Sequence, residues 1–283
     1  MSSITFSKYK ALLFDVYGTL IDWEEAIYQN LKPMLERYHS PLAKSKRETL
    51  TAFRGVETDL QARYPTMLYS DILARVHAEL ASRVKGDPTH PETVPASTTS
   101  VTSGGSDNTT TPVGTSASPR GDPDEAEHVA FGKSIPSWKP FPDTIPALAY
   151  LSTKFKLSVL SNVDKESFSA TRKVLETSDP NHQFTFDGIY TAQDIGSYKP
   201  AIANFEYALK KLKDEFGVKK DEVLVVACSL PHDHVPSNKL GLTSVYIDRG
   251  SVSGLNENVD ARYDAKYESL GAFAAAVEKE FAT

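Results

Sequence analysis

Residues 11–20 read Ala-Leu-Leu-Phe-Asp-Val-Tyr-Gly-Thr-Leu, an apolar run that ends at an aspartate and then passes into a turn. The apolar residues 11–14 predict a buried β-strand, and Gly18 with Thr19 predicts the turn after it. In open α/β sheets, ligands bind beyond the carboxyl ends of the strands, which is where Asp15 would lie. An aspartate at a strand end is more often a turn former or a helix cap. A catalytic role for Asp15 therefore depends on the residues around it.

Strand and helix patterns alternate along the second half of the chain. Apolar runs predict strands at residues 156–160, 188–190, 222–227 and 243–247, with amphipathic helices between them and a last helix at about 270–281. Such alternation is typical of a parallel sheet covered by helices. We therefore expect the α/β fold class.

Helical patterns alone follow the first strand. Asp22 is expected to cap a helix from residue 23 to about 38, and apolar residues at helical spacing around residues 53–60 and 72–80 indicate two more. Because this stretch lies between the first two strands, we predict a helical cap domain inserted over the catalytic edge of the sheet. The expected division is a core of residues 1–21 and 140–283 and a cap of residues 22–139.

One segment of the cap has a different composition. Residues from about 86 to 133 are rich in Ser, Thr, Pro, Gly and Asp, as in TVPASTTSVTSGGSDNTTTP. Such a segment cannot bury enough apolar surface to offset the entropy of ordering its backbone. We predict that it is a disordered insertion without a catalytic role.

Composition excludes several classes of partner. The 283 residues carry a formal net charge of −6, which counts against nucleic acid or an anionic membrane as the main partner. Cys228 is the single cysteine, so no intramolecular disulfide can form. No stretch approaches the roughly 18 uncharged apolar residues of a membrane helix, and the N-terminus lacks the pattern of a signal peptide. We expect a cytoplasmic protein whose oligomeric state is open, a homodimer included.

Further polar residues follow the later predicted strands. Ser161 and Asn162 follow one strand, and Ser229 and Asp233 follow another, so we expect them beside Asp15 at the same edge of the sheet. A carboxylate can act as a nucleophile if positive charge keeps it ionised and donors hold it in line. Lys199 could supply the charge, and the hydroxyl groups of Thr19 and Ser161 could supply the donors.

Four short motifs resemble, in order, those of the haloacid dehalogenase superfamily. They are F-D-V-Y-G-T-L at 14–20, L-S-N at 160–162, Y-K-P at 198–200 and the later Asp233. The resemblance spans nearly the whole chain outside the insertion, and it implies a Rossmann-like core with an inserted cap. Phosphatases of that superfamily typically carry D-x-D in the first motif, whereas this chain has Tyr17 at the second position. The D-x-Y-G-T-L form resembles the 2-haloacid dehalogenase (type II) branch.

The resemblance implies a metal-free hydrolase without a cofactor, acting on a small carboxylate. Asp15 would attack the halogen-bearing C2 of a short 2-haloacid and form an ester, which water then hydrolyses at the carboxyl carbon of the aspartate. Thr19 and Lys199 would orient and stabilise Asp15. Asp233 would place or activate the water.

The same resemblance assigns Ser161 and Asn162 to the substrate carboxylate or the leaving group. Tyr17 and Ser229 complete the expected substrate-binding set at the strand ends. A carboxylate substrate also favours an arginine, because the guanidinium fork matches its two oxygens. Arg54 on the cap is the candidate, although a solvated helix arginine fits the pattern equally well.

The fourth motif departs from the dehalogenase pattern and leaves alternatives open. Residues 228–233 read C-S-L-P-H-D, without the asparagine and tryptophan of that pattern, and Phe205 replaces a tyrosine. His232 and His234 could transfer protons or could be ordinary loop histidines. The alternatives are a Mg²⁺-dependent phosphatase with Asp233 as its second acid, and a catalytically degenerate scaffold that binds a ligand or a partner.

Overall fold

The computed structural model describes residues 4–86 and 124–283, so most of the predicted disordered insertion lies outside the described residues. Within these ranges, six strands form one parallel sheet in the order β3-β2-β1-β4-β5-β6. The strands are β1 (Ala11–Phe14), β2 (Lys156–Ser161), β3 (Gly188–Thr191), β4 (Val223–Ala227), β5 (Thr243–Ile247) and β6 (Ala265–Tyr267). This arrangement confirms the α/β fold class. The strand β6 was not predicted, because three partly exposed residues give no apolar run.

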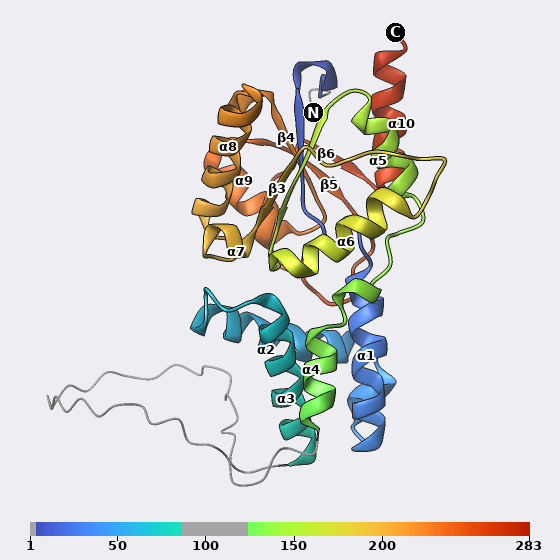
Figure 1. Ribbon diagram of the computed structural model, residues 1–283, viewed down its shortest axis with the longest axis vertical. Coiled ribbons are helices and arrows are strands. Elements are labelled where there is room, and N and C mark those ends of the chain that lie inside the picture. Colours follow the sequence, from blue (N-terminus) through green and yellow to red (C-terminus); the bar gives the residue numbers. More distant parts are fainter. Residues whose placement is uncertain (1–3, 87–123) are drawn as a thin grey trace, which may run out of the picture.

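Both faces of the sheet are buried under helices (Figure 1). The core helices are α5 (Thr144–Ser152), α6 (Lys165–Thr177), α7 (Ala192–Ile195), α8 (Ile202–Phe216), α9 (Val235–Leu240) and α10 (Leu270–Phe281). Alternate residues of β1 enter opposite layers of the core. Leu13 packs in one cluster with Phe205 of α8, whereas Phe14 packs in another with Phe273 of α10. Burial on both faces explains why β1 is a continuous apolar run.

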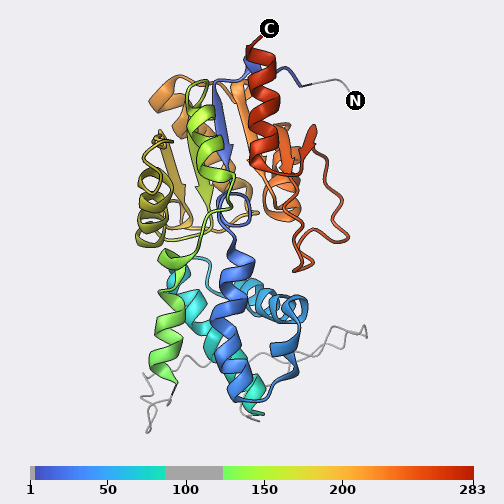
Figure 2. The same ribbon diagram turned by 90° about the vertical axis from the view of Figure 1, so that its right-hand side faces the viewer.

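Four further helices stand apart from the sheet, beyond the carboxyl ends of its central strands (Figures 1 and 2). They are α1 (Trp23–Arg37), α2 (Lys46–Arg63), α3 (Tyr69–Lys85) and α4 (Glu125–Gly132). As expected, the Asp22 side chain caps α1 by accepting a hydrogen bond from the Glu25 amide at 3.1 Å. The two segments that connect these helices to the core lie side by side, since the Asp22 amide donates to the Lys139 carbonyl at 2.9 Å.

The prediction of disorder over residues 86–133 is wrong for its last part, because Glu125–Gly132 form α4. Phe131 is buried against the other cap helices, and Nδ1 of His128 lies 2.7 Å from Nδ1 of His77 on α3. Gly132 allows close packing, since a Cβ at this position would lie 2.4 Å from the Ser70 carbonyl oxygen. A few buried side chains next to an existing helix are thus enough to form a helix at the end of this segment.

No helix within residues 4–86 and 124–283 has the length and apolar character needed to cross a membrane.

Candidate active site

Asp15 lies at the carboxyl end of β1, next to the centre of the sheet. The Thr19 hydroxyl donates to Oδ2 of Asp15 at 2.7 Å, and Nζ of Lys199 donates to Oδ1 at 2.8 Å. Between them, Gly18 has a φ of 98°, and a Cβ there would lie 2.7 Å from Sγ of Cys228. Only glycine suits both this left-handed backbone and this close approach. The turn therefore returns Thr19 to Asp15.

Lys199 joins Asp15 to a second carboxylate. Its ammonium group also donates to Oδ1 of Asp233 at 2.7 Å, and Lys199 and Asp233 are both 2% exposed. Burial alone would lower the pKa of Lys199, but the two carboxylates raise it well above its ordinary value. Lys199 therefore stays charged and keeps a positive charge beside Asp15.

Burial acts in the opposite direction on Asp233. It raises the pKa of this carboxyl to about 7, although the charge of Lys199 opposes the rise. A group with such a pKa exchanges protons near neutrality, as a general base must. Asp233 can therefore accept a proton in the cavity beside Asp15.

Asn162 holds Lys199 in place. The Lys199 amide donates to Oδ1 of Asn162 at 2.6 Å, and Nδ2 of Asn162 donates to the Lys199 carbonyl at 3.1 Å. The oxygen and the nitrogen of this amide side chain are thus both bonded to the backbone of Lys199. These contacts make Asn162 a positioning residue for Lys199, and its expected role in substrate binding stays a prediction.

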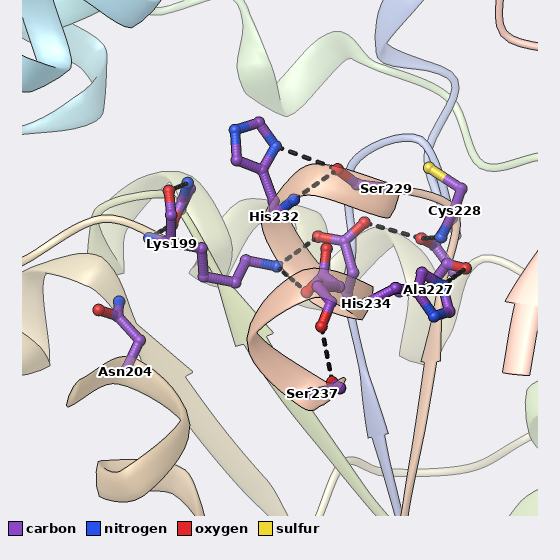
Figure 3. A network of polar contacts seen from close by, with 12 residues as sticks. Lys199, Asn204, Ala227, Cys228, Ser229, His232, His234 and Ser237 are labelled. Atoms are coloured by element: carbon purple, nitrogen blue, oxygen red, sulfur yellow. Dashed lines mark hydrogen bonds and ion pairs between the residues drawn. The ribbon is translucent and has the colours of Figure 1, made fainter. Parts of the chain in front are cut away.

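The loop after β4 carries Ser229 and one π-helical turn, Leu230–His234. Figure 3 shows Lys199 pointing its ammonium group toward this loop, with His232 and His234 on different sides of it. Ser229 Oγ lies 3.1 Å from Nδ1 of His232, whose pKa falls to about 4 because of burial and the nearby charge of Lys199. His232 is therefore neutral near pH 7.

His234 is a core residue and takes no part in the site. Its ring nitrogens lie 2.9 Å from the Ser244 hydroxyl and 3.1 Å from the Ala227 carbonyl, and it is fully buried. Cys228 is also inert, because burial raises the pKa of its thiol well above the ordinary value. Of these loop residues, Ser229 and His232 line the cavity beside Asp15, whereas His234 does not.

A cavity of about 610 Å³ of empty space, partly open to solvent, lies between these strand ends and the cap. All of the predicted site residues line it except Thr19, which supports Asp15 from below: Asp15, Tyr17, Arg54, Ser161, Asn162, Lys199, Ser229 and Asp233. The expectation that polar residues after the parallel strands lie at one edge of the sheet therefore predicted residues that line this cavity.

Two buried polar atoms of the lining residues have no hydrogen-bond partner among the described residues, namely Oγ of Ser161 and Oδ2 of Asp233. An unpaired buried polar atom costs free energy, so a native protein retains one where a ligand or water completes the bonding. Ser161 and Asp233 are therefore suited to contact the substrate or the hydrolytic water.

The cap contributes residues that sequence reasoning missed, among them Trp23, Glu57, Gln61 and Tyr69. A signal for two of them was present. Arg54, Glu57 and Gln61 recur at helical spacing, each one position after the apolar stripe inside the cap. The stripe predicts which face of α2 is buried, and the neighbouring face then borders whatever lies beside the cap.

Arg54 and Tyr17 enter the cavity while bonded elsewhere. Nη1 of Arg54 donates to the Ser253 carbonyl at 3.0 Å, and the Tyr17 hydroxyl lies 2.8 Å from Oγ1 of Thr171. The ring of Tyr17 also packs edge-on against Trp138, with centroids 5.5 Å apart. Both side chains are therefore held in fixed positions at the cavity wall.

Comparison with known proteins agrees with this architecture. A sequence profile of haloacid dehalogenase-like hydrolases matches residues 9–227. A glyceraldehyde 3-phosphate phosphatase from Methanocaldococcus jannaschii is 28% identical over 126 residues, which is 44% of this chain and 51% of that protein. The alignment thus spans about half the length of that relative.

Two solved structures are similar over nearly their whole length. L-2-haloacid dehalogenase from Xanthobacter autotrophicus, with chloropropionic acid covalently bound, has a TM-score of 0.61 at 18% identity and covers 95% of this chain and 98% of its own. The HAD-hydrolase YfnB from Bacillus subtilis, bound to magnesium, has a TM-score of 0.62 at 14% identity and covers 95% and 99%. At these identities the likeness concerns the fold.

Proposed function

The chain belongs to the haloacid dehalogenase-like hydrolases, and within this family we propose that it hydrolyses the carbon–halogen bond of short 2-haloacids through an ester on Asp15. One observation carries the proposal. Asp15 faces a cavity in which Lys199 and Arg54 supply positive charge, while the position two residues after Asp15 holds the phenol of Tyr17.

The first step is a displacement at carbon. A carboxylate oxygen of Asp15 bonds to C2 of the acid, the carbon–halogen bond breaks, and the halide leaves with the electron pair. Lys199 and Thr19 hold the carboxylate in line for this attack. Arg54 is placed to bind the substrate carboxylate with its guanidinium fork.

The second step is hydrolysis of the ester. Water attacks the carboxyl carbon of Asp15 and gives one proton to Asp233. The bond between this carbon and the ester oxygen then breaks, and the second proton of the water passes to that oxygen, which releases a 2-hydroxy acid and restores the Asp15 carboxylate. The unpaired Oδ2 of Asp233 and its pKa of about 7 suit it to this task. Lys199 stabilises the negative charge that develops on Asp15.

The alternative is a Mg²⁺-dependent phosphatase, which the archaeal relative favours. The described donor set does not fit such an ion well. Thr19 and Lys199 each donate to one oxygen of Asp15, and Lys199 also donates to Oδ1 of Asp233. Tyr17 also lacks the carboxylate that would protonate the leaving group of a phosphate ester.

The test compares halide release from 2-chloropropionate with phosphate release from an aryl phosphate, each with Mg²⁺ and with EDTA. We expect halide release that is insensitive to EDTA and is lost in Asp15→Asn. Phosphate release that requires Mg²⁺ would instead identify the phosphatase. A folded protein that turns over neither substrate would indicate a binding scaffold.

A further inference from the structure

The cap side of the cavity has a composition that hydrolysis of a simple haloacid does not require. Aromatic rings from Tyr17, Trp23, Tyr69 and Trp138 line it, together with the carboxyl group of Glu57. A short alkyl 2-haloacid offers an apolar chain beyond C2, and a carboxyl group beside that chain would gain nothing from it. The lining therefore indicates that the substrate has another polar group.

Glu57 is only partly engaged by the protein. The Tyr69 hydroxyl donates to its Oε1 at 2.5 Å, and within residues 4–86 and 124–283 its side chain has no second hydrogen bond and no ion pair. Burial raises the pKa of Glu57 to about 7, although the bond from Tyr69 and the nearby charge of Arg54 oppose this rise. Its other oxygen thus has no hydrogen-bond partner within these ranges, and the residue lines the cavity.

Aromatic faces and a carboxylate together favour an organic cation. The faces of Trp and Tyr rings attract ammonium groups through their quadrupole, most strongly where water is excluded. A carboxylate beside them completes the charge, and the pair is favourable where further hydrogen bonds satisfy it. Lys199 and Arg54 are the cationic side chains of the lining. Under the proposed mechanism, Lys199 pairs with Asp15 and Arg54 binds the substrate carboxylate.

The spacing of the cap residues indicates the length of such a ligand. Arg54 and Glu57 are three residues apart on α2, and residues at this separation have Cβ atoms about 5–6 Å apart on one helix face. A carboxylate bound to Arg54 and a cation bound to Glu57 would therefore belong to one short molecule.

We propose that the substrate is a 2-haloacid that also carries an ammonium group, which binds between Glu57 and the surrounding aromatic rings. This inference rests on the proposed function for the chemistry at C2, whereas the selection of the cation depends only on the cap. It names a substrate class, an amino-substituted 2-haloacid of about four carbons.

Binding of the hydroxy-acid products tests this selection without any turnover. The matched pair is 4-amino-2-hydroxybutanoate and 2-hydroxypentanoate, which differ in an ammonium group against a methyl group. By calorimetry at pH 7.5, we expect the wild type to bind 4-amino-2-hydroxybutanoate about 10- to 100-fold more tightly than 2-hydroxypentanoate. This difference in affinity is what a hydrogen bond to a charged group provides. Glu57→Leu should lose this preference, and Glu57→Gln should retain only a small part of it.

Asp59→Asn is the matched control, because Asp59 lies on the same helix, pairs with Arg63 and does not line the cavity. We expect it to keep the preference for the ammonium group, and thermal unfolding should show that all variants are folded. Equal affinity of the wild type for the two products, or no binding of either, would overturn the inference. So would a preference that survives in Glu57→Leu.

Turnover separates this inference from the proposed function. Halide release from 2-chloropentanoate and from 4-amino-2-chlorobutanoate is measured against blanks without enzyme. Halide release from both acids with a higher kcat/KM for the amine supports both proposals. Equal kcat/KM values for the two acids reject only the selection of the ammonium group. Product binding that prefers the amine, without halide release from either acid, rejects only the dehalogenase reaction.

Discussion

The ammonium group of Lys199 lies 2.8 Å from Oδ1 of Asp15, and the Lys199 side chain is 2% exposed. The two residues are 184 positions apart in the chain, so the fold alone brings them together. A buried charge is tolerated only beside a partner, and each of these residues supplies the partner of the other. This pair holds a positive charge beside the carboxylate at the end of β1, as a nucleophilic carboxylate requires.

Replacing Asp15 by Asn should abolish turnover, because an amide oxygen is a poor nucleophile and cannot form the ester. We expect a loss of at least about a thousandfold in halide release, a magnitude typical of removing a group that acts directly in the reaction. Asp221→Asn, at the exposed opposite end of β4, is the control and should leave activity unchanged.

Isotope labelling tests the ester on Asp15 directly. A single turnover in H₂¹⁸O should place the label in the peptide that contains Asp15, since water attacks the carboxyl carbon of the aspartate. Mass spectrometry of that peptide provides the measurement. Label found only in the hydroxy acid would mean that water attacks the substrate carbon itself.

Lys199→Met should destabilise the protein by about 3–5 kcal/mol, because it leaves Asp15 and Asp233 buried without a compensating charge. The free energy of unfolding is measured by denaturant titration. Lys199→Met combined with Asp233→Asn should recover part of the loss, since one of the two unpaired charges is removed. Lys210→Met, in an exposed pair with Asp214, should have a much smaller effect. Equal effects of the two lysine variants would contradict the buried pair.

Hydrolysis of the ester should become faster as the pH rises through neutrality. Burial raises the pKa of Asp233 to about 7, so the carboxyl group is mostly protonated at pH 6 and mostly ionised at pH 8. Only the ionised form can accept a proton, which predicts an increase of roughly tenfold between these values. Decay of the ester after a single turnover, followed by mass spectrometry, measures this step. Asp233→Asn should accumulate the ester and lose the pH dependence; an unchanged profile in this variant would exclude Asp233 as the base.

Arg54→Lys should raise the KM for a 2-haloacid by about tenfold while changing kcat by less than about threefold. Lysine keeps the charge but lacks the planar fork that binds both carboxylate oxygens, and a rise in KM alone indicates the loss of uniform binding. Arg47→Lys is the control, because Arg47 lies on the same helix, pairs with Glu257 and does not line the cavity. A large fall in kcat without a change in KM would contradict the assigned role.

Local patterns were sufficient for most of the core. The strand at residues 11–14 and the last helix at 270–281 were predicted at the residues where they occur. Burial on both faces of a sheet gives a continuous apolar run, and burial on one face of a helix gives apolar residues at helical spacing. The helix α4 was missed because its few buried residues, such as Phe131, are diluted by a long polar segment. The strand β6 was missed because it is short and partly exposed.

The site was predictable where it depends on strand ends and unpredictable where it depends on packing between domains. Asp15, Ser161 and Asp233 follow apolar strands, and parallel strands bring their carboxyl ends to one edge. Glu57 and Tyr69 reach the same cavity only because α2 and α3 pack over that edge. A helical period shows that a face is buried but does not show what it is buried against.

The linear chain alone was enough to identify a parallel sheet, an aspartate at the end of its first strand and the short motifs that accompany it, because these follow from local burial and turn chemistry. Tertiary structure decided the rest. It placed one lysine between two carboxylates, bonded Asn162 to the backbone of Lys199, and brought Glu57 of the cap to the cavity that Asp15 lines. These relationships depend on distances between residues far apart in the chain, which only the packing of complete elements determines.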